Sequence, residues 1–284
     1  MKNFVKIIFR GFGQVMLQNN AWTGMLFLFG IFFNSWIFGL GAILGNIVST
    51  YSAKILRYSK EDINDGLYGF NGTLLGIAIL FLFKFSIFVV SIIILGSIFS
   101  TIIMHQIKKY RIPVYTAPFV VSTWLIAFIF KLFNFFPIES LLPVSNSLNI
   151  FSATFMGFGQ VMFQGSIVTG LIFFLAIIIN SRKSAIYSLY GSTLGIVIAL
   201  IFSFQLSAIN IGLFGYNAVL CAIALESKKL ENFIFATFAI VLSVFLNFWM
   251  GNIGIITLTA PFVFATWITL LLKKYGAKSL SMKY

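Results

Sequence analysis

A short polar segment occurs twice in the chain, 146 residues apart. Residues 11–24 read GFGQVMLQNNAWTG and residues 157–170 read GFGQVMFQGSIVTG, which are identical at 9 of 14 positions. Each copy places a glutamine, Gln14 or Gln160, inside an apolar stretch. An unpaired amide in hydrocarbon is costly, so a membrane protein that keeps one usually gives it a partner or a ligand. The repetition therefore predicts a duplicated fold with a polar path between its halves.

Two further blocks repeat. Residues 67–79 match residues 213–225 at 6 of 13 positions, and residues 116–125 match residues 259–268 at 7 of 10. Over the three blocks 22 of 37 positions are identical, where about four matches would be expected by chance. We infer a duplicated chain with a first transmembrane repeat at 1–135, a linker at 136–148 and an inverted second repeat at 149–284.

The composition places this duplicated chain in a membrane. Hydrophobic residues make up 60% of the chain and charged residues 9%, whereas soluble domains carry about 25% charged residues. The net charge of +13 comes from small scattered groups of basic residues, which is typical of loops at an anionic membrane surface. No basic face indicates nucleic-acid binding. The single cysteine, Cys221, excludes an intramolecular disulfide and a thiolate metal cluster.

The hydrophobic runs predict an all-α integral membrane protein. In the first half we expect spans at 4–18, 22–33, 36–56, 85–104 and 114–133. The glycine-interrupted segments 67–81 and 213–225 are short and occupy corresponding places, which is typical of re-entrant half-helices beside a binding site. Five spans per half is an odd number, so the halves enter the membrane in opposite senses. The prediction is ten transmembrane helices plus two re-entrant half-helices in two inverted repeats.

Charge predicts the orientation. We expect both termini on the cytoplasmic side, together with Lys2, Lys6, Arg10, the basic cluster of the loop from His105 to Arg111, Lys228, Lys229 and the C-terminal lysines. The group Lys54, Arg57 and Lys60 is expected on the outer side and weakens this bias.

Uncharged polar and aromatic residues recur at matched places. The pairs are Gln14 and Gln160, Phe70 and Tyr216, Asn71 and Asn217, Leu74 and Leu220, and Thr116 and Thr259. No ionisable residue recurs in the apolar segments, which disfavours an ion-coupled carrier and a hydrolase. We predict a pore that offers hydrogen-bond acceptors between apolar walls to a flat neutral solute rich in N–H donors. Asn71 and Asn217 are expected to brace the broken backbone of the half-helices.

The segments GxGQVxxQ, LYGFNG and TAPF, each present in both halves in full or in altered form, resemble the urea transporter family. The resemblance covers nearly the whole chain. It implies a continuous pore in each protomer, a homotrimer in the plasma membrane, and urea moving down its gradient by a channel-like mechanism. We expect no cofactor and no metal.

The resemblance also assigns roles. Gln14 and Gln160 would supply the acceptor oxygens of an outer and an inner urea site, flanked by Phe70 and Tyr216, with Thr116 and Thr259 at the constriction. The pore-lining residues that it implies are Leu17, Leu74, Phe163, Leu220, Val15 and Val161. Some positions depart from the family pattern: Leu17 stands where an aromatic residue is common, and Val120 and Val263 stand where asparagine is frequent.

The sequence motifs leave other functions to be weighed. Within transport, the alternative is a channel for another small neutral amide or for ammonia, although an ammonia path would be expected to use intramembrane histidines. A membrane enzyme acting on lipid would need a nucleophile, base or metal set, which His105, Cys221 and the six acidic residues do not assemble. A structural scaffold would give no reason to keep polar residues at symmetric places.

Overall fold

A computed structural model describes residues 4–134, 147–227 and 229–281. Within these ranges the chain forms helices and no strands, which confirms the all-α class. The first half contains α1 (Phe4–Gln14), α2 (Ala21–Asn34), α3 (Trp36–Ile55), α4 (Lys60–Asn64), α5 (Gly69–Leu82), α6 (Ile87–Lys109) and α7 (Ala117–Phe133). The second half contains α8 (Ile150–Gln160), α9 (Ile167–Asn180), α10 (Arg182–Ile201), α11 (Leu206–Asn210), α12 (Tyr216–Ala224), α13 (Leu230–Asn252) and α14 (Ala260–Ser281).

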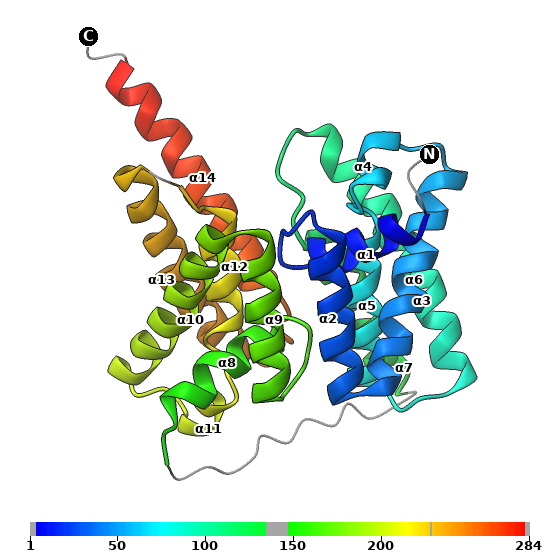
Figure 1. The fold of residues 1–284 in the computed structure, drawn as a ribbon, viewed down its shortest axis with the longest axis horizontal. Coiled ribbons are helices and arrows are strands. Elements are labelled where there is room, and N and C mark those ends of the chain that lie inside the picture. Colours follow the sequence, from blue (N-terminus) through cyan, green and yellow to red (C-terminus); the bar gives the residue numbers. More distant parts are fainter. Residues whose placement is uncertain (1–3, 135–146, 228, 282–284) are drawn as a thin grey trace.

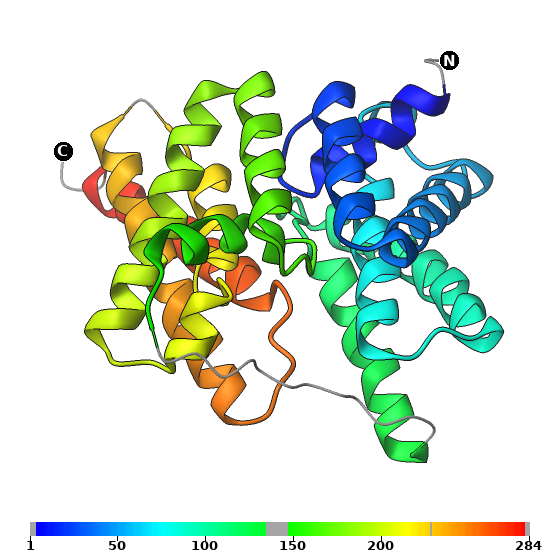
Figure 2. The ribbon, with the colours of Figure 1, turned by 60° about the horizontal axis from the view of Figure 1, so that its bottom comes forward.

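The helices of the two halves correspond in order, and most correspond in length. The helices α1 and α8 each have 11 residues, α2 and α9 have 14, α3 and α10 have 20, and α6 and α13 have 23. The two halves lie side by side in both views of the ribbon (Figures 1 and 2). The predicted linker 136–148 lies almost entirely outside the described residues, so the domain boundaries stay a prediction.

The halves meet where α2 packs against α9, and these two helices run antiparallel. Thr23 Oγ1 donates a hydrogen bond to the carbonyl oxygen of Ala176 (2.9 Å), and Thr169 Oγ1 donates to that of Gly30 (3.1 Å). Between them the rings of Phe27 and Phe173 contact edge to face, 5.0 Å apart. The start of each helix therefore lies beside the end of its counterpart. A twofold relation between equivalent antiparallel helices has its axis perpendicular to both of them.

This relation gives the molecule two opposite ends. The short helix α4 lies at the upper end in Figure 1, and its counterpart α11 lies at the lower end. We call these ends the α4 side and the α11 side. Side-chain contacts show that the start of α1 and the ends of α3 and α6 also lie on the α4 side. Lys54 Nζ lies 5.0 Å from the centre of the Phe4 ring, and the rings of Tyr58 and His105 stack 3.8 Å apart.

The expected position of one basic group is wrong. The sequence places Lys54, Arg57 and Lys60 on the side opposite the N-terminus, yet the contacts above place them beside it. The error comes from counting α1 as a span. At about 1.5 Å per residue, its 11 residues reach about 16 Å, well short of the roughly 30 Å of a bilayer core. The chain bends after Gln14, and α1 and α2 together make one passage to the α11 side.

The first helix and the glycine-rich segment differ in how far each of them reaches between the two sides. The chain enters α5 from the α4 side, and α6 begins at Ile87 on the α11 side, so residues 66–86 pass from one side to the other. The short α1 covers only part of this distance. The second half begins at the opposite end, where Asn149 N donates to Asn210 Oδ1 of α11 (3.1 Å).

Two local predictions also need correction. The first helix ends at Gln14, not at residue 18, because the chain turns and Leu17 adopts a positive φ of 60°. The expected loop from His105 to Arg111 is helical as far as Lys109, and His105 stacks on Tyr58. Four helices among the described residues are long and apolar enough to cross a membrane, namely α3, α6, α10 and α13. The helices α2, α5, α7 and α9 are apolar but shorter.

Glycines allow α3 and α5 to touch backbone to backbone. A Cβ added at Gly45 would lie 2.0 Å from the carbonyl oxygen of Gly72, and a Cβ at Gly76 would lie 2.0 Å from that of Gly41. These glycines lie four residues apart on each helix, the spacing that brings membrane helices into close contact. The second half keeps this contact with small residues, since Gly191 approaches the backbone of Ala218.

We therefore expect Gly45→Ala to destabilise the protein. The new methyl group would force the backbones of α3 and α5 apart, and overpacking of this kind costs about 1–3 kcal/mol. The measurement is the thermal unfolding midpoint of the detergent-solubilised protein. Gly251→Ala is the matched control, because a Cβ at this exposed helical glycine meets nothing within 4 Å. Equal midpoints for the two variants would contradict the backbone contact.

Candidate functional site

The repeated glutamine segment forms a turn at the junction of the halves. The helices α1 and α8 end at Gln14 and Gln160, and the turns that follow place Leu17 and Phe163 at the same positive φ of 60°. A second glutamine closes each turn, because Gln18 Nε2 donates to the carbonyl oxygen of Met16 (2.9 Å) and Gln164 donates likewise to Met162. Equivalent residues thus adopt equivalent geometry.

The same second glutamines join the two halves. Asn180 Nδ2 donates to Gln18 Oε1 (2.7 Å), and Asn34 Nδ2 donates to Gln164 Oε1 (2.9 Å). Both glutamines are fully buried. These four residues were missing from the predicted site, although each one also recurs at an equivalent place. Their repetition at equivalent places in the sequence is the signal that would have identified them.

Gln14 is held by the loop after α4. Its Nε2 donates to the carbonyl oxygen of Asp65 (3.0 Å), which fixes the orientation of the amide. Arg10 Nη1 bonds to Asp65 Oδ1 (3.1 Å) and to the carbonyl oxygen of Asn64 (3.0 Å), so the local charges pair. Gln14 Oε1 accepts no hydrogen bond from the described residues. The amide therefore presents a free acceptor oxygen.

Gln160 has a different setting. It is half-buried, and neither end of its amide is hydrogen-bonded to the described part of the chain. Met156 and Ile211 stand where the first half has Arg10 and Asp65, so no ion pair forms beside it. The structure does not bring Gln14 and Gln160 together. Each belongs to the turn of its own half, near opposite ends of the molecule.

The two threonines do meet. Thr259 Oγ1 donates to Thr116 Oγ1 at 2.7 Å, and both residues are buried. Thr116 precedes α7 and Thr259 precedes α14, and neither hydroxyl caps its own helix by a side-chain hydrogen bond. The residues just before them, Tyr115 and Leu258, have positive φ angles of 45° and 47°. These bends aim the starts of α7 and α14 at each other across the junction.

Asn71 and Asn217 hold these helix starts in place. Asn71 Oδ1 accepts from the backbone N–H of Phe119, and Asn217 Oδ1 accepts from that of Phe262, both at 3.1 Å. These N–H groups lie in the first turn of α7 and α14, where the helix itself offers no partner. The asparagines thus fasten the starts of α5 and α12 to the segments that carry the threonines.

The apolar residues predicted to line a pore surround the junction. Val15, Val161, Leu74 and Leu220 are fully buried in the main hydrophobic core. Phe163 reaches from the second half into the first, with its ring 5.2 Å from Phe81 and 6.3 Å from Phe119. Leu17, at the equivalent place, carries no ring and is half-buried.

Phe70 and Tyr216 occupy equivalent places with different chemistry. The Tyr216 hydroxyl hydrogen-bonds to Thr257 Oγ1 (3.0 Å), Asn247 Oδ1 (3.2 Å) and the carbonyl oxygen of Leu258. Asn247 Nδ2 also donates to the carbonyl oxygen of Leu213 (2.9 Å). The hydroxyl is therefore committed to the loop that carries Thr259. Phe70 has no hydroxyl, so the first half has no equivalent hydrogen-bond network at this position.

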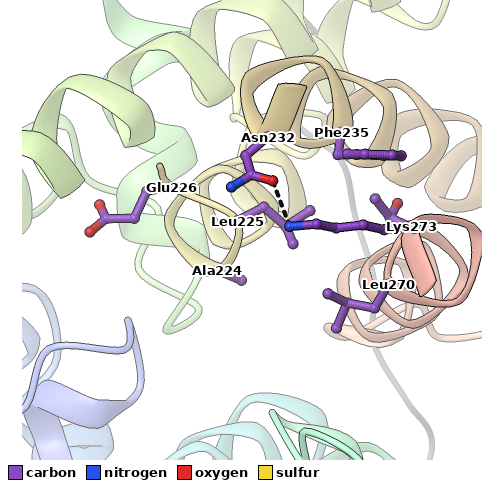
Figure 3. A pocket seen from close by; sticks show the side chains of 8 residues that line it. Ala224, Leu225, Glu226, Asn232, Phe235, Leu270 and Lys273 are labelled. Atoms are coloured by element: carbon purple, nitrogen blue, oxygen red, sulfur yellow. Dashed lines mark hydrogen bonds between the residues drawn. The ribbon is translucent and has the colours of Figure 1, made fainter. Parts of the chain in front are cut away.

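A small polar cavity lies beyond the end of α12. It has a volume of about 190 Å³, and Lys273 Nζ donates to Asn232 Oδ1 (2.5 Å) at its edge. Figure 3 shows Glu226 pointing away from this pair. Leu80 and Phe130 stand at the equivalent places of Glu226 and Lys273, so the first half is apolar there. None of the predicted site residues lines this cavity.

Two related helical halves, four helices long enough to cross a membrane, and uncharged polar residues meeting at the junction define a multi-pass membrane protein with a polar seam. The family model for urea transporters matches residues 5–274. The chain therefore belongs to the urea transporter family, as the sequence motifs predict.

Individual relatives agree with this assignment. Urea transporter 1 of Ovis aries is 30% identical over 296 residues, covering 95% of this chain and 77% of the relative. Urea transporter 1 of Capra hircus is 29% identical over the same shares of both chains. Urea transporter 1 of Rattus norvegicus is 30% identical over 240 residues, which cover 78% of this chain and 62% of the relative.

We expect Tyr216→Phe to lower stability, because it removes the hydroxyl that bonds to the buried oxygen of Leu258, to Asn247 Oδ1 and to Thr257 Oγ1. Such losses cost about 1–3 kcal/mol. The measurement is the thermal unfolding midpoint in detergent. Tyr51→Phe is the matched control, since Tyr51 is 56% exposed on α3. An unchanged midpoint for Tyr216→Phe would show that the hydroxyl network does not hold the Thr259 loop.

Proposed function

We propose that this member of the urea transporter family carries urea down its concentration gradient by facilitated diffusion. The path runs from Gln14 past Thr116 and Thr259 to Gln160. The observation that supports it most is the meeting of the two equivalent threonine hydroxyls where the halves join. The path itself offers oxygens and no net charge, which suits a neutral solute and leaves the desolvation cost of an ion unmet.

The glutamines offer urea an acceptor at each end of the path. Urea is planar, and its N–H groups lie along its edges. Because Asp65 binds the amide nitrogen of Gln14, the amide oxygen is the group left for the solute. Gln160 has no such constraint and can offer either end of its amide. A solute that loses water at the turn regains a hydrogen bond there.

The threonines serve the middle of the path. Their hydroxyl oxygens touch at 2.7 Å, so urea passes beside them and exchanges hydrogen bonds with both. The buried Val15, Val161, Leu74 and Leu220 surround this stretch with apolar side chains. Phe163, and the rings of Phe70 and Tyr216, flank the faces of the planar solute. Asn71 and Asn217 keep the threonine segments in position.

We also propose that the two halves are inverted repeats, with ten passages through the membrane and the short α1 and α8 reaching only part of the way. The antiparallel α2 and α9 support this arrangement, because their twofold axis then lies in the membrane plane. We propose a homotrimer, on the basis of family membership, with one path in each protomer.

Charge supports placing the α4 side, and both termini, in the cytoplasm. The described basic side chains divide very unequally between the two ends. The alternating directions of the helices that carry them assign Lys84 and Lys131 to the α11 side. The same alternation assigns to the α4 side Lys6, Arg10, Lys54, Arg57, Lys60, Lys108, Lys109, Arg111, Arg182, Lys183, Lys229, Lys273 and Lys274. Basic residues concentrate on the cytoplasmic side of membrane proteins. The most fitting location is the plasma membrane.

Urea flux into proteoliposomes tests the proposal. We expect stopped-flow light scattering to show rapid urea entry without a proton or sodium gradient. Gln14→Leu and Gln160→Leu should each lower the rate about tenfold, because one hydrogen bond to the solute is lost. Gln205→Leu is the control, since Gln205 is exposed beside α11. Flux that requires either ion gradient, or equal flux in all three variants, would refute the path.

The double variant Thr116→Val/Thr259→Val tests the middle of the path separately. Valine keeps the shape of threonine and removes the hydroxyl, so the fold should persist while urea flux falls about tenfold. Thr237→Val, which alters a hydroxyl on α13 bonded to Tyr190, is the control. The unfolding midpoint of each variant shows whether it is folded. Unchanged flux in the folded double variant would exclude the threonines from the path.

A further inference from the structure

A second cavity, distinct from the proposed path, lies on the α4 side between α1, the end of α3 and α4. Its volume is about 530 Å³. Three basic residues line it, Lys54, Arg57 and Lys60, and its apolar lining includes the buried Ile7 and Ile63. The aromatic ring of Tyr58 lines it as well. A cavity with basic and apolar walls suits a ligand that combines an anion with hydrocarbon.

The positive charge in this cavity is not neutralised by the neighbouring acidic residues. Asp62 is paired with Lys108, and Asp65 is paired with Arg10. Glu61 is the remaining carboxylate of α4, and no acidic residue is among the described residues that line the cavity. Lys54, Arg57 and Lys60 form no ion pair with the described residues. One carboxylate against three cations leaves a net positive charge.

The duplicated fold does not require this charge. Leu200, Ser203 and Leu206 stand at the places of Lys54, Arg57 and Lys60 in the second half, and Phe204 stands at that of Tyr58. There the same stretch is closed by aromatic packing, with the rings of Phe204 and Phe248 stacked 3.9 Å apart. Only the half whose α3–α4 corner faces the basic side of the molecule has the cationic cavity.

Apolar surface continues from the cavity along α3. Ile55 is 64% exposed and Tyr51 is 56% exposed, and Leu56 beside them is 43% exposed. These side chains lie at the end of a helix long enough to cross a membrane. A lipid could therefore place its acyl chains against this face of α3 and its headgroup in the cavity.

We propose that this cavity binds the phosphate of an anionic membrane lipid. Lys54, Arg57 and Lys60 bind the phosphate oxygens, and the lipid chains follow the exposed face of α3. Basic pockets between helices at the cytoplasmic face recognise phospholipid headgroups in this way. Inorganic phosphate could bind the same basic side chains, but it has no acyl chain to contact the apolar surface of α3 and would therefore bind more weakly.

The test uses the full chain purified in a neutral detergent. The shift of its unfolding midpoint is titrated with dioctanoyl phosphatidylglycerol, with dioctanoyl phosphatidylcholine and with inorganic phosphate. We expect saturable stabilisation by phosphatidylglycerol alone. The variant Lys54→Gln/Arg57→Gln/Lys60→Gln should bind that lipid about a hundredfold more weakly, given the contribution of each basic side chain near an anionic surface.

A matched variant separates the cavity from the general charge of this side. Lys109→Gln/Arg111→Gln/Lys274→Gln also removes three exposed charges but leaves the cavity intact, and it should bind the lipid as the unaltered protein does. Equal weakening in both triple variants would overturn the site, as would equal stabilisation by all three ligands. Stabilisation by inorganic phosphate as strong as that by phosphatidylglycerol would overturn the lipid as the ligand. If the first triple variant does not fold, Arg57→Gln and Lys60→Gln singly decide the same question, with about fivefold weakening expected from each.

Discussion

The antiparallel contact between α2 and α9 is the interaction on which the rest of the structure depends. Its apolar centre is the edge-to-face pair of Phe27 and Phe173, which are equivalent residues. On each side of this pair a threonine hydroxyl binds a carbonyl oxygen of the opposite helix. Further out, Gln18 binds Asn180 and Gln164 binds Asn34. Both threonine hydroxyls and both glutamine amide oxygens of this contact bind groups of the other half, and the glutamine amide nitrogens bind the backbone of their own turn, so these groups can lie in a medium without water.

The hydrogen bonds between the halves also determine which polar side chains keep a free donor or acceptor for a solute. The second glutamine of each turn is used for joining the halves, and Asn71 and Asn217 are used for holding helix starts. The acceptor oxygen of Gln14 has no partner among the described residues, and the two threonine hydroxyls bind only each other. Buried polar groups are normally satisfied within the protein. Groups left free or bonded only to each other beside this contact are therefore the ones that we propose bind and release a passing molecule.

The sequence predicted the fold class, the duplication and the family, because these follow from hydrophobic run length and from identities between blocks. The prediction was wrong for the first helix, which was counted as a transmembrane span. The stretch 4–18 has the composition of a span, but the turn at Leu17 shortens it to α1. Counting one span too many before residue 54 placed Lys54, Arg57 and Lys60 on the wrong side relative to the N-terminus. Likewise, the pairing of Gln18 with Asn180 joins residues 162 positions apart and could be found only from the packed helices.

The two halves differ most at equivalent corners that lie at opposite ends of the molecule. Because α2 and α9 run antiparallel, equivalent corners of the two halves lie at opposite ends of the molecule. On the α4 side this corner carries Lys54, Arg57 and Lys60, and on the α11 side it carries Leu200, Ser203 and Leu206. The same division separates the Arg10–Asp65 pair beside Gln14 from the neutral Met156 and Ile211 near Gln160. The interior positions keep matched amides and hydroxyls, which is what one path shared by both halves, as proposed, would require. The corners are free to differ, because each one faces a different surface.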